Sequence, residues 1–152
     1  MLKDVIINFR TISGMPHGKP DELDFMTDGY YTFDDNIGCI SYEETEVTGM
    51  TGTRTSVIVM PNKVVVDRDG SITSRMVFEE GYDSEFPYRT PFGDTMLGLK
   101  TRMIKQDISE RGGNVEIEYD LNIGHAMCSR NKLILDVKEI GEMSDARNYQ
   151  LN

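Results

Sequence analysis

Strict alternation of apolar and polar residues marks the stretch from Asn114 to Ile123, where every odd position is apolar and every even position is polar. Successive side chains of a β-strand point to opposite sides, so this pattern predicts a strand with one dry face and one wet face. Similar patterns over residues 94–105 and 132–140 predict two further strands. In the second of these, Leu133 and Leu135 lie on one side and Asp136 lies on the other.

Seven more runs are rich in β-branched and aromatic residues, which favour strands. They cover residues 5–12, 23–33, 38–46, 53–60, 63–68, 71–79 and 84–90. Residue pairs that tolerate tight-turn dihedrals separate the strands. These pairs are Asp35-Asn36, Thr51-Gly52, Pro61-Asn62, Asp69-Gly70, Glu80-Gly81, Phe92-Gly93 and Gly112-Gly113. Asp69-Gly70 gives the strongest hairpin prediction, because Asp-Gly is a preferred two-residue hairpin turn.

Short strands joined by hairpin turns, with no helical pattern between them, predict an antiparallel meander. One dry face per strand leaves two architectures, a two-sheet sandwich or a closed up-and-down barrel. We favour the barrel, because closure removes the exposed edges that invite aggregation. The prediction is therefore an all-β, single antiparallel up-and-down barrel of about eight to ten strands over residues 1–140. A polar tail follows over residues 141–152.

Composition supports a single β-domain. The chain has 152 residues and a mass of 17.3 kDa, the length of one domain. Val, Ile and Thr number 10, 13 and 12, whereas Ala, the best helix former, occurs only at Ala126 and Ala146.

Charge and hydropathy exclude several classes of partner. The formal net charge is −10, so the basic surface typical of a nucleic-acid binder is missing, and anionic membrane surfaces are disfavoured as well. No apolar run approaches the ~18–20 residues of a membrane span. The apolar stretch at the N-terminus is broken by Asn8 and Arg10 before it could form a secretory signal, so we expect a cytoplasmic protein.

Motifs of known chemistry are scarce. The chain has two histidines, His17 and His125, and two cysteines, Cys39 and Cys128, without a CxxC spacing. We interpret the cysteines as buried free thiols packed as small hydrophobes. A Gly-x-Ser-x-Gly elbow, a phosphate loop and a dinucleotide fingerprint are all missing from the sequence. We therefore expect no metal, no cofactor and no catalytic residue.

The order of motifs along the chain resembles one known family. Gly29-Tyr30-Tyr31 is followed by Ile40-Ser41-Tyr42-Glu43-Glu44, Arg68-Asp69-Gly70, Phe78-Glu79-Glu80-Gly81, Tyr88-Arg89-Thr90-Pro91-Phe92-Gly93, Thr101 and Tyr119-Asp120-Leu121. This succession is similar to the YwiB-like family, small bacterial calycin-like (lipocalin-like) β-barrel proteins classed as a domain of unknown function. The resemblance extends from about residue 5 to 139. It implies a barrel with an enclosed interior and brings no activity, ligand or catalytic residue.

Strand parity places a polar group inside such a barrel. If Tyr42 points inward, Glu44 does too, and if Val66 points inward, so does Arg68, because side chains repeat with a period of two. Tyr88 lies near a strand end. The candidate ligand-binding residues of the barrel interior are therefore Tyr42, Glu44, Arg68 and Tyr88.

Two interpretations of this group stay open. In the first, Arg68 binds a carboxylate or phosphate of a ligand and tyrosine hydroxyls orient it. In the second, Glu44 and Arg68 pair with each other and tie strands together.

Three classes of function follow, in order of preference. The first is non-enzymatic binding of a small apolar or amphipathic ligand, which predicts a cavity within the ~300–1,000 Å³ of ligand pockets. The second is an interaction or structural module with a filled interior, such as a homodimer. An enzyme comes third, because no nucleophile, base or metal set is recognisable.

Overall fold

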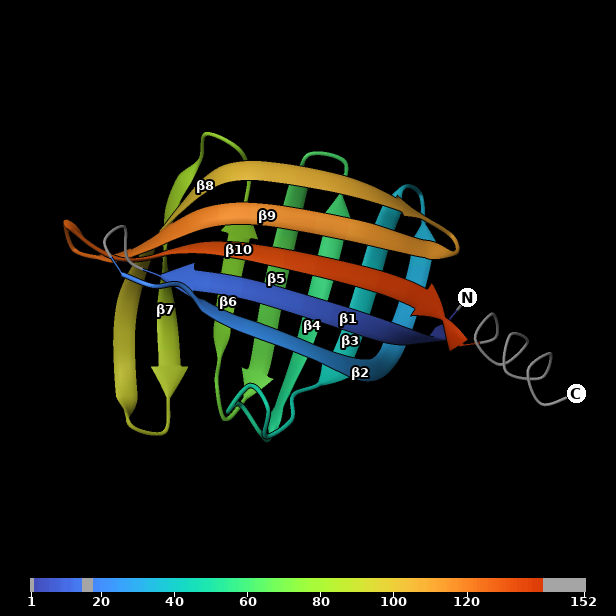
Figure 1. Cartoon of the computed structure of the whole chain (residues 1–152), viewed down its shortest axis with the longest axis horizontal. Helices are drawn as coiled ribbons and strands as arrows, with labels where there is room; N and C mark the ends of the chain where they lie inside the picture. Colours follow the sequence, from blue (N-terminus) through green and yellow to red (C-terminus); the bar gives the residue numbers. More distant parts are fainter. Residues whose placement is uncertain (1, 15–17, 141–152) are drawn as a thin grey trace, which may run out of the picture.

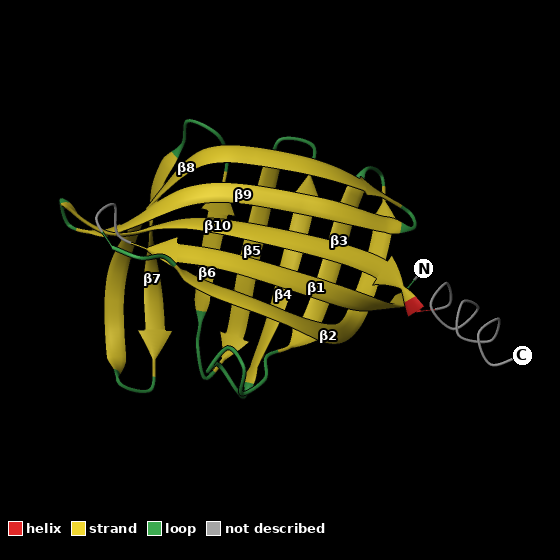
Figure 2. Ribbon diagram, in the orientation of Figure 1, coloured by secondary structure: helices red, strands yellow, loops and turns green. Residues whose placement is uncertain are grey.

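The computed structural model describes residues 2–14 and 18–140, and these form ten strands. The strands are β1 (Lys3–Gly14), β2 (Asp21–Asp34), β3 (Ile37–Glu43), β4 (Thr53–Met60), β5 (Lys63–Gly70), β6 (Ser74–Phe78), β7 (Asp83–Thr90), β8 (Gly93–Ser109), β9 (Gly112–Ile123) and β10 (Ala126–Glu139). Figure 2 shows how strands dominate the described chain. The predicted tail over residues 141–152, like His17, lies outside the described residues.

All ten strands belong to one antiparallel sheet in the order β6-β5-β4-β3-β2-β1-β10-β9-β8-β7. The first and last strands of the chain pair with each other, from Val5 opposite Glu139 to Gly14 opposite Arg130. The sheet curls round so that β2, β1, β10, β9 and β8 form one wall and β3 to β6 cross behind it (Figure 1). The predicted all-β antiparallel barrel is confirmed.

Two long strands turn the corners between the walls. β2 pairs with β1 over Asp21 to Tyr31 and then with β3 over Tyr30 to Asp34. Gly29 lies at this corner, and a Cβ there would collide with the carbonyl oxygen of Ser41 and lie 2.9 Å from Ile7 Cδ1. A glycine is therefore required for the close approach of the neighbouring backbone. At the other corner, β8 pairs with both β7 and β9 and carries a bulge between Thr101 and Met103.

A few contacts close the barrel between the β6 region on one side and β7 and β8 on the other. Thr73 and Arg89 exchange two backbone hydrogen bonds of 3.0 Å. Farther along, the Glu79 amide donates to Thr101 Oγ1 at 3.2 Å and the Ile104 amide donates to Glu80 Oε1 at 2.8 Å. Side chains thus replace part of the missing ladder at this seam.

Inward-facing residues of the strands fill the core. Fully buried side chains include Val5, Ile7, Tyr31, Ile40, Val59, Val64, Phe78, Leu99, Val115, Ile117, Leu135 and Val137. Tyr31 donates to the carbonyl of Ser109 at 2.6 Å. β2 and β8 are not neighbours in the sheet, so this bond ties two separated strands through the interior.

Three predicted turns were wrong in position. The turn predicted at Phe92-Gly93 lies one residue earlier, at Pro91-Phe92, because Gly93 begins β8 and pairs with Thr90. Asp69 and Gly70 continue β5, where they pair with Arg54 and Thr53, and the chain turns at residues 71–73 instead. Gly70 (φ +141°) packs against the Gly52 carbonyl, so its glycine serves a close approach rather than the turn. Likewise Gly112 and Gly113 pair inside β9, and the turn lies at residues 110–111. Consequently β6 begins at Ser74 rather than at residue 71, and β8 continues to Ser109 rather than ending at 105.

Candidate functional site

A cavity of about 180 Å³ lies inside the barrel. Its lining comes from inward positions of six strands and from the β3–β4 loop: Phe9, Thr11, Leu23, Phe25, Tyr42, Glu44, Thr48, Met50, Val57, Val66, Arg68 and Leu133. The volume is smaller than the several hundred cubic ångströms that the sequence-based hypothesis of a binding barrel predicts. Three of the four candidate residues, Tyr42, Glu44 and Arg68, line this interior pocket together.

Glu44 is a buried carboxylate with its own hydrogen-bond donors. Its side chain is 1% exposed. Thr55 Oγ1 donates to Oε2 at 2.5 Å, and Thr48 Oγ1 donates to Oε1 at 3.0 Å. Each carboxylate oxygen of Glu44 therefore has a threonine hydroxyl as its donor. Glu44 also holds the β3–β4 loop, because Thr48 belongs to that loop.

Arg68 faces Glu44 across the strands without a close hydrogen bond to it. The two atoms nearest each other, Arg68 Nε and Glu44 Oε2, are 3.9 Å apart. Nε is buried and has no hydrogen-bond partner, and Nη1 donates only to Met76 Sδ at 3.6 Å. The side chain is 19% exposed, so the guanidinium reaches the edge of solvent. Its donor capacity is therefore mostly unused by the described protein atoms.

An aromatic wall borders these charges. The Phe9 ring stacks on Phe25 with centroids 4.7 Å apart and meets Tyr42 at 4.9 Å in a tilted arrangement. Burial and, next, the Glu44 carboxylate raise the pKa of the Tyr42 phenol well above its usual value, against the opposing effect of Arg68. Tyr42 thus stays a neutral hydrogen-bond donor over the physiological pH range.

The fourth candidate, Tyr88, is not brought to the pocket. It lies half-buried on β7, where it packs against the core and pairs with Thr95, and it does not line the cavity. Sequence reasoning also missed Tyr119, which lies outside the cavity lining as well. Burial raises the pKa of Tyr119 and the charge of Arg68 lowers it, so the phenol lies within the field of that guanidinium. The inward parity of Tyr119 was visible in the alternating pattern of residues 114–123, whereas its proximity to Arg68 was not.

A larger hollow, of about 520 Å³, lies where Pro61, Glu79, Glu80, Ile104 and Lys105 meet. None of these described side chains has a buried polar atom without a partner. The hollow therefore shows no unmet polar group, in contrast to the interior pocket.

The cysteines do not lie as expected. Cys39 is only partly buried and Cys128 is exposed, so the prediction of two buried thiols was wrong. Cys128 lies at an irregularity of β10, where the register shifts between Met127 and Ser129 and Cys128 has no partner residue on β9.

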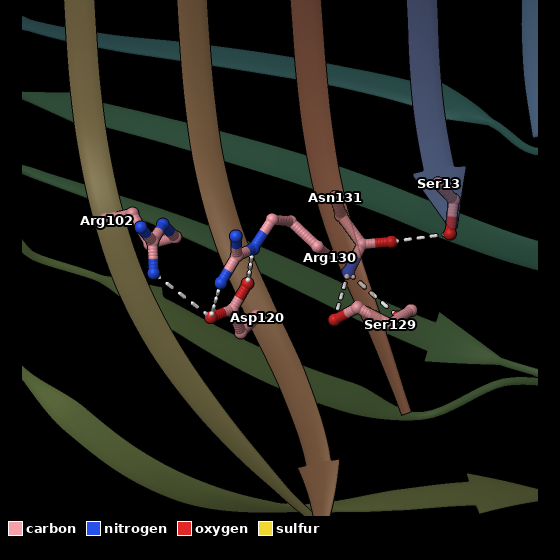
Figure 3. A network of polar contacts seen from close by, with 6 residues as sticks. All are labelled: Ser13, Arg102, Asp120, Ser129, Arg130 and Asn131. Carbon is pink, nitrogen blue, oxygen red and sulfur yellow. Dashed lines mark hydrogen bonds and ion pairs between the residues drawn. The ribbon is translucent and has the colours of Figure 1, made fainter. Parts of the chain in front are cut away.

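Further polar contacts tie together the four neighbouring strands β1, β10, β9 and β8 (Figure 3). Asp120 of β9 is only 4% exposed and accepts from Arg130 Nε at 2.9 Å and from Arg102 Nη1 at 3.4 Å. The hydrogen bond and charge of Asp120 raise the pKa of Arg130. Beside it, Ser13 Oγ donates to Asn131 Oδ1 at 2.6 Å. Within each of these two sets the side chains pair with one another, so both sets hold neighbouring strands together.

Comparisons with known proteins agree with this architecture. The family profile described as "Domain of unknown function (DUF1934)" matches residues 7–135. The "Uncharacterized beta-barrel protein YwiB" of Bacillus subtilis (strain 168) is 30% identical over 107 residues, which are 70% of this chain and 74% of that protein. The crystal structure of ywiB protein from Bacillus subtilis matches with a TM-score of 0.80 at 22% identity, over 91% of this chain and 92% of that one. No helix among the described residues is long and apolar enough to cross a membrane.

Proposed function

The chain belongs to the family described as Domain of unknown function (DUF1934), and we propose that its barrel binds one small amphipathic molecule in the interior pocket beside Arg68. The resemblance to the YwiB-like family in the order of motifs is confirmed. The family supplies the fold, so the argument for function rests on the pocket itself.

One observation carries the proposal: an arginine that lines a largely apolar cavity and whose buried Nε has no hydrogen-bond partner. Phe9, Phe25 and Leu133 form the apolar lining, and Arg68 Nε is buried without an acceptor. Buried polar groups in native proteins are nearly always hydrogen-bonded, because an unmade bond costs about 1–3 kcal/mol. A bound molecule with an acceptor would meet this unsatisfied donor. Ligand sites generally combine an apolar lining with a few convergent polar groups.

The alternative, an interaction module or homodimer, requires an interior filled by side chains. The cavity beside Arg68 counts against a completely filled barrel. Purely structural pairing of Glu44 with Arg68 is also weakened, because Glu44 already accepts from Thr55 and Thr48 while Arg68 Nε stays 3.9 Å away. We therefore place ligand binding first.

A thermal-shift screen of small compounds, repeated with a pocket-filling variant, tests the proposal. Leu133 lines the pocket and is only partly buried, so Leu133→Trp should occupy the cavity at a stability cost of about 1–3 kcal/mol. Compounds that raise the melting temperature of the wild-type protein should lose their effect on Leu133→Trp. Ile134→Trp, on the next residue of β10 and outside the pocket lining, is the matched control. Stabilisation that persists in Leu133→Trp, or no stabilising compound at all, would overturn the proposal.

A further inference from the structure

We infer, on the premise of the proposed function, that the ligand is a small monocarboxylate carrying a single ring or a short carbon chain. The inference assigns a chemical class to the molecule in the interior pocket. The inference follows from three features: the hydrogen-bonding groups in and beside the pocket that lack partners, the charges already present in the pocket, and the volume of the cavity.

The groups without partners can donate hydrogen bonds. Arginine carries five N–H donors and no acceptor. Those of Arg68 contact only Met76 Sδ at 3.6 Å and approach Glu44 at 3.9 Å. Ser74, 4% exposed, has a buried hydroxyl with no partner. Ser74 lies directly opposite Arg68 across β5 and β6, so its unpaired hydroxyl neighbours Arg68, although only Arg68 lines the cavity.

Tyr119 adds a further hydroxyl, which lies outside the cavity lining but within the electrostatic influence of Arg68. Burial raises the pKa of its phenol, so the hydroxyl keeps its proton at neutral pH. Its ring is fixed edge-on against Phe78 with centroids 4.9 Å apart. Guanidinium and hydroxyl groups together favour a ligand that brings acceptor oxygens.

The charges select among such ligands. A carboxylate is planar and matches the planar guanidinium, and charge-assisted bonds between them are about twice as strong as neutral ones. An amine would meet the like charge of Arg68 and leave its donors unpaired. Glu44 lies 3.9 Å from Arg68 Nε and repels any anion bound there, a dianion about twice as strongly as a monoanion. One negative charge on the ligand therefore fits best.

The cavity limits the carbon skeleton. A buried apolar cavity of about 150 Å³ holds one benzene molecule, and drug-sized ligands need about 300 Å³ or more. The volume of about 180 Å³ thus fits one ring or a few carbons beside the charged group. The stacked Phe9–Phe25 pair, with Leu23 and Leu133, supplies the apolar lining for that part.

Three probes of nearly equal size test the inference: benzoate, benzamide and benzylamine. Each is titrated into the full-length protein at neutral pH and followed by ¹H–¹⁵N NMR, including the Nε–H signal of Arg68. We expect benzoate to bind with a Kd on the order of 1 mM, benzamide at least about tenfold more weakly, and benzylamine not measurably. In Arg68→Met, benzoate should bind no more tightly than benzamide. Arg75 is an exposed arginine on β6 that pairs with Asp67, so Arg75→Met should bind benzoate like wild type. Ser74→Ala, which removes a side-chain hydroxyl without adding bulk, should weaken benzoate a few-fold and serves as a second test if Arg68→Met fails to fold.

The outcomes separate the inference from the proposed function. Equal binding of benzoate and benzamide, abolished by Leu133→Trp, would overturn the carboxylate class and keep the pocket as a binding site. Benzoate binding that survives both Arg68→Met and Leu133→Trp would place the anion elsewhere and overturn the inference. Shifts from none of the probes at about 10 mM, well above the expected Kd, would overturn the inference and count against the pocket itself.

Discussion

Replacing Thr55 by valine should destabilise the barrel through Glu44. Thr55 is fully buried, and its hydroxyl donates to Glu44 Oε2 at 2.5 Å. Valine keeps the shape and removes the donor, which leaves a buried carboxylate with Thr48 on its other oxygen and Arg68 Nε at 3.9 Å. A hydrogen bond to a charged group contributes about 1.5–3 kcal/mol, so we expect the free energy of unfolding to fall by about 2 kcal/mol. For a chain of this length, that lowers the melting temperature by about 4–8 °C.

Chemical denaturation of a double-mutant cycle gives the decisive readout. In a Glu44→Gln background the lost bond is a neutral one, so Thr55→Val should cost only about 1 kcal/mol there. The two costs should therefore differ by about 1 kcal/mol, outside the ~0.3–0.5 kcal/mol within which independent sites add. Equal costs in both backgrounds would refute the reasoning, because Thr55 would then act through packing alone.

Three further predictions concern the frame that holds the pocket. Gly29→Ala should lower the free energy of unfolding by about 1–3 kcal/mol in urea denaturation, because the new methyl group meets the Ser41 carbonyl; an unchanged midpoint would contradict the corner geometry. Burial raises the pKa of Tyr31 to about 12, whereas tyrosine in an unfolded chain ionises near pH 10. Between these pH values the native state binds more protons than the unfolded state, so the free energy of unfolding should fall as pH rises from about 10. Tyr31→Phe should be less stable than wild type at neutral pH and lose less stability in that alkaline range; the same alkaline loss in both proteins would refute this. Asp120→Asn should lower the melting temperature by about 2–4 °C, and by less in about 1 M salt, because its arginine partners are half-exposed; a salt-independent loss would speak against ion pairing.

Periodicity predicted the architecture and much of the pocket. A period of two is sufficient to place Tyr42, Glu44 and Arg68 on the inner face, since β3 and β5 run without a bulge from their apolar core positions. It does not show which inward residues meet across the barrel, because that depends on the register between distant strands. Tyr88 and Tyr119 both pack against the core, yet neither lines the cavity that Tyr42 lines.

Glycine positions misled the sequence-based prediction for a related reason. Asp69-Gly70 has the chemistry of a tight turn, but Gly70 is needed where β5 passes the Gly52 carbonyl. The same holds for Gly112, where a Cβ would collide with the Val137 carbonyl. A glycine required by a strand that is distant in sequence looks, in the sequence alone, like a glycine required by a turn.

Native mass spectrometry of gently purified protein tests the central claim most directly. The intact mass of wild type is compared with the 17.3 kDa chain, with Arg68→Met and with Arg75→Met. We predict a reproducible extra mass of one small molecule per chain in wild type and Arg75→Met, absent from Arg68→Met. A bare chain mass in all three proteins, or a dimer without an adduct, would contradict the account and favour an interaction module.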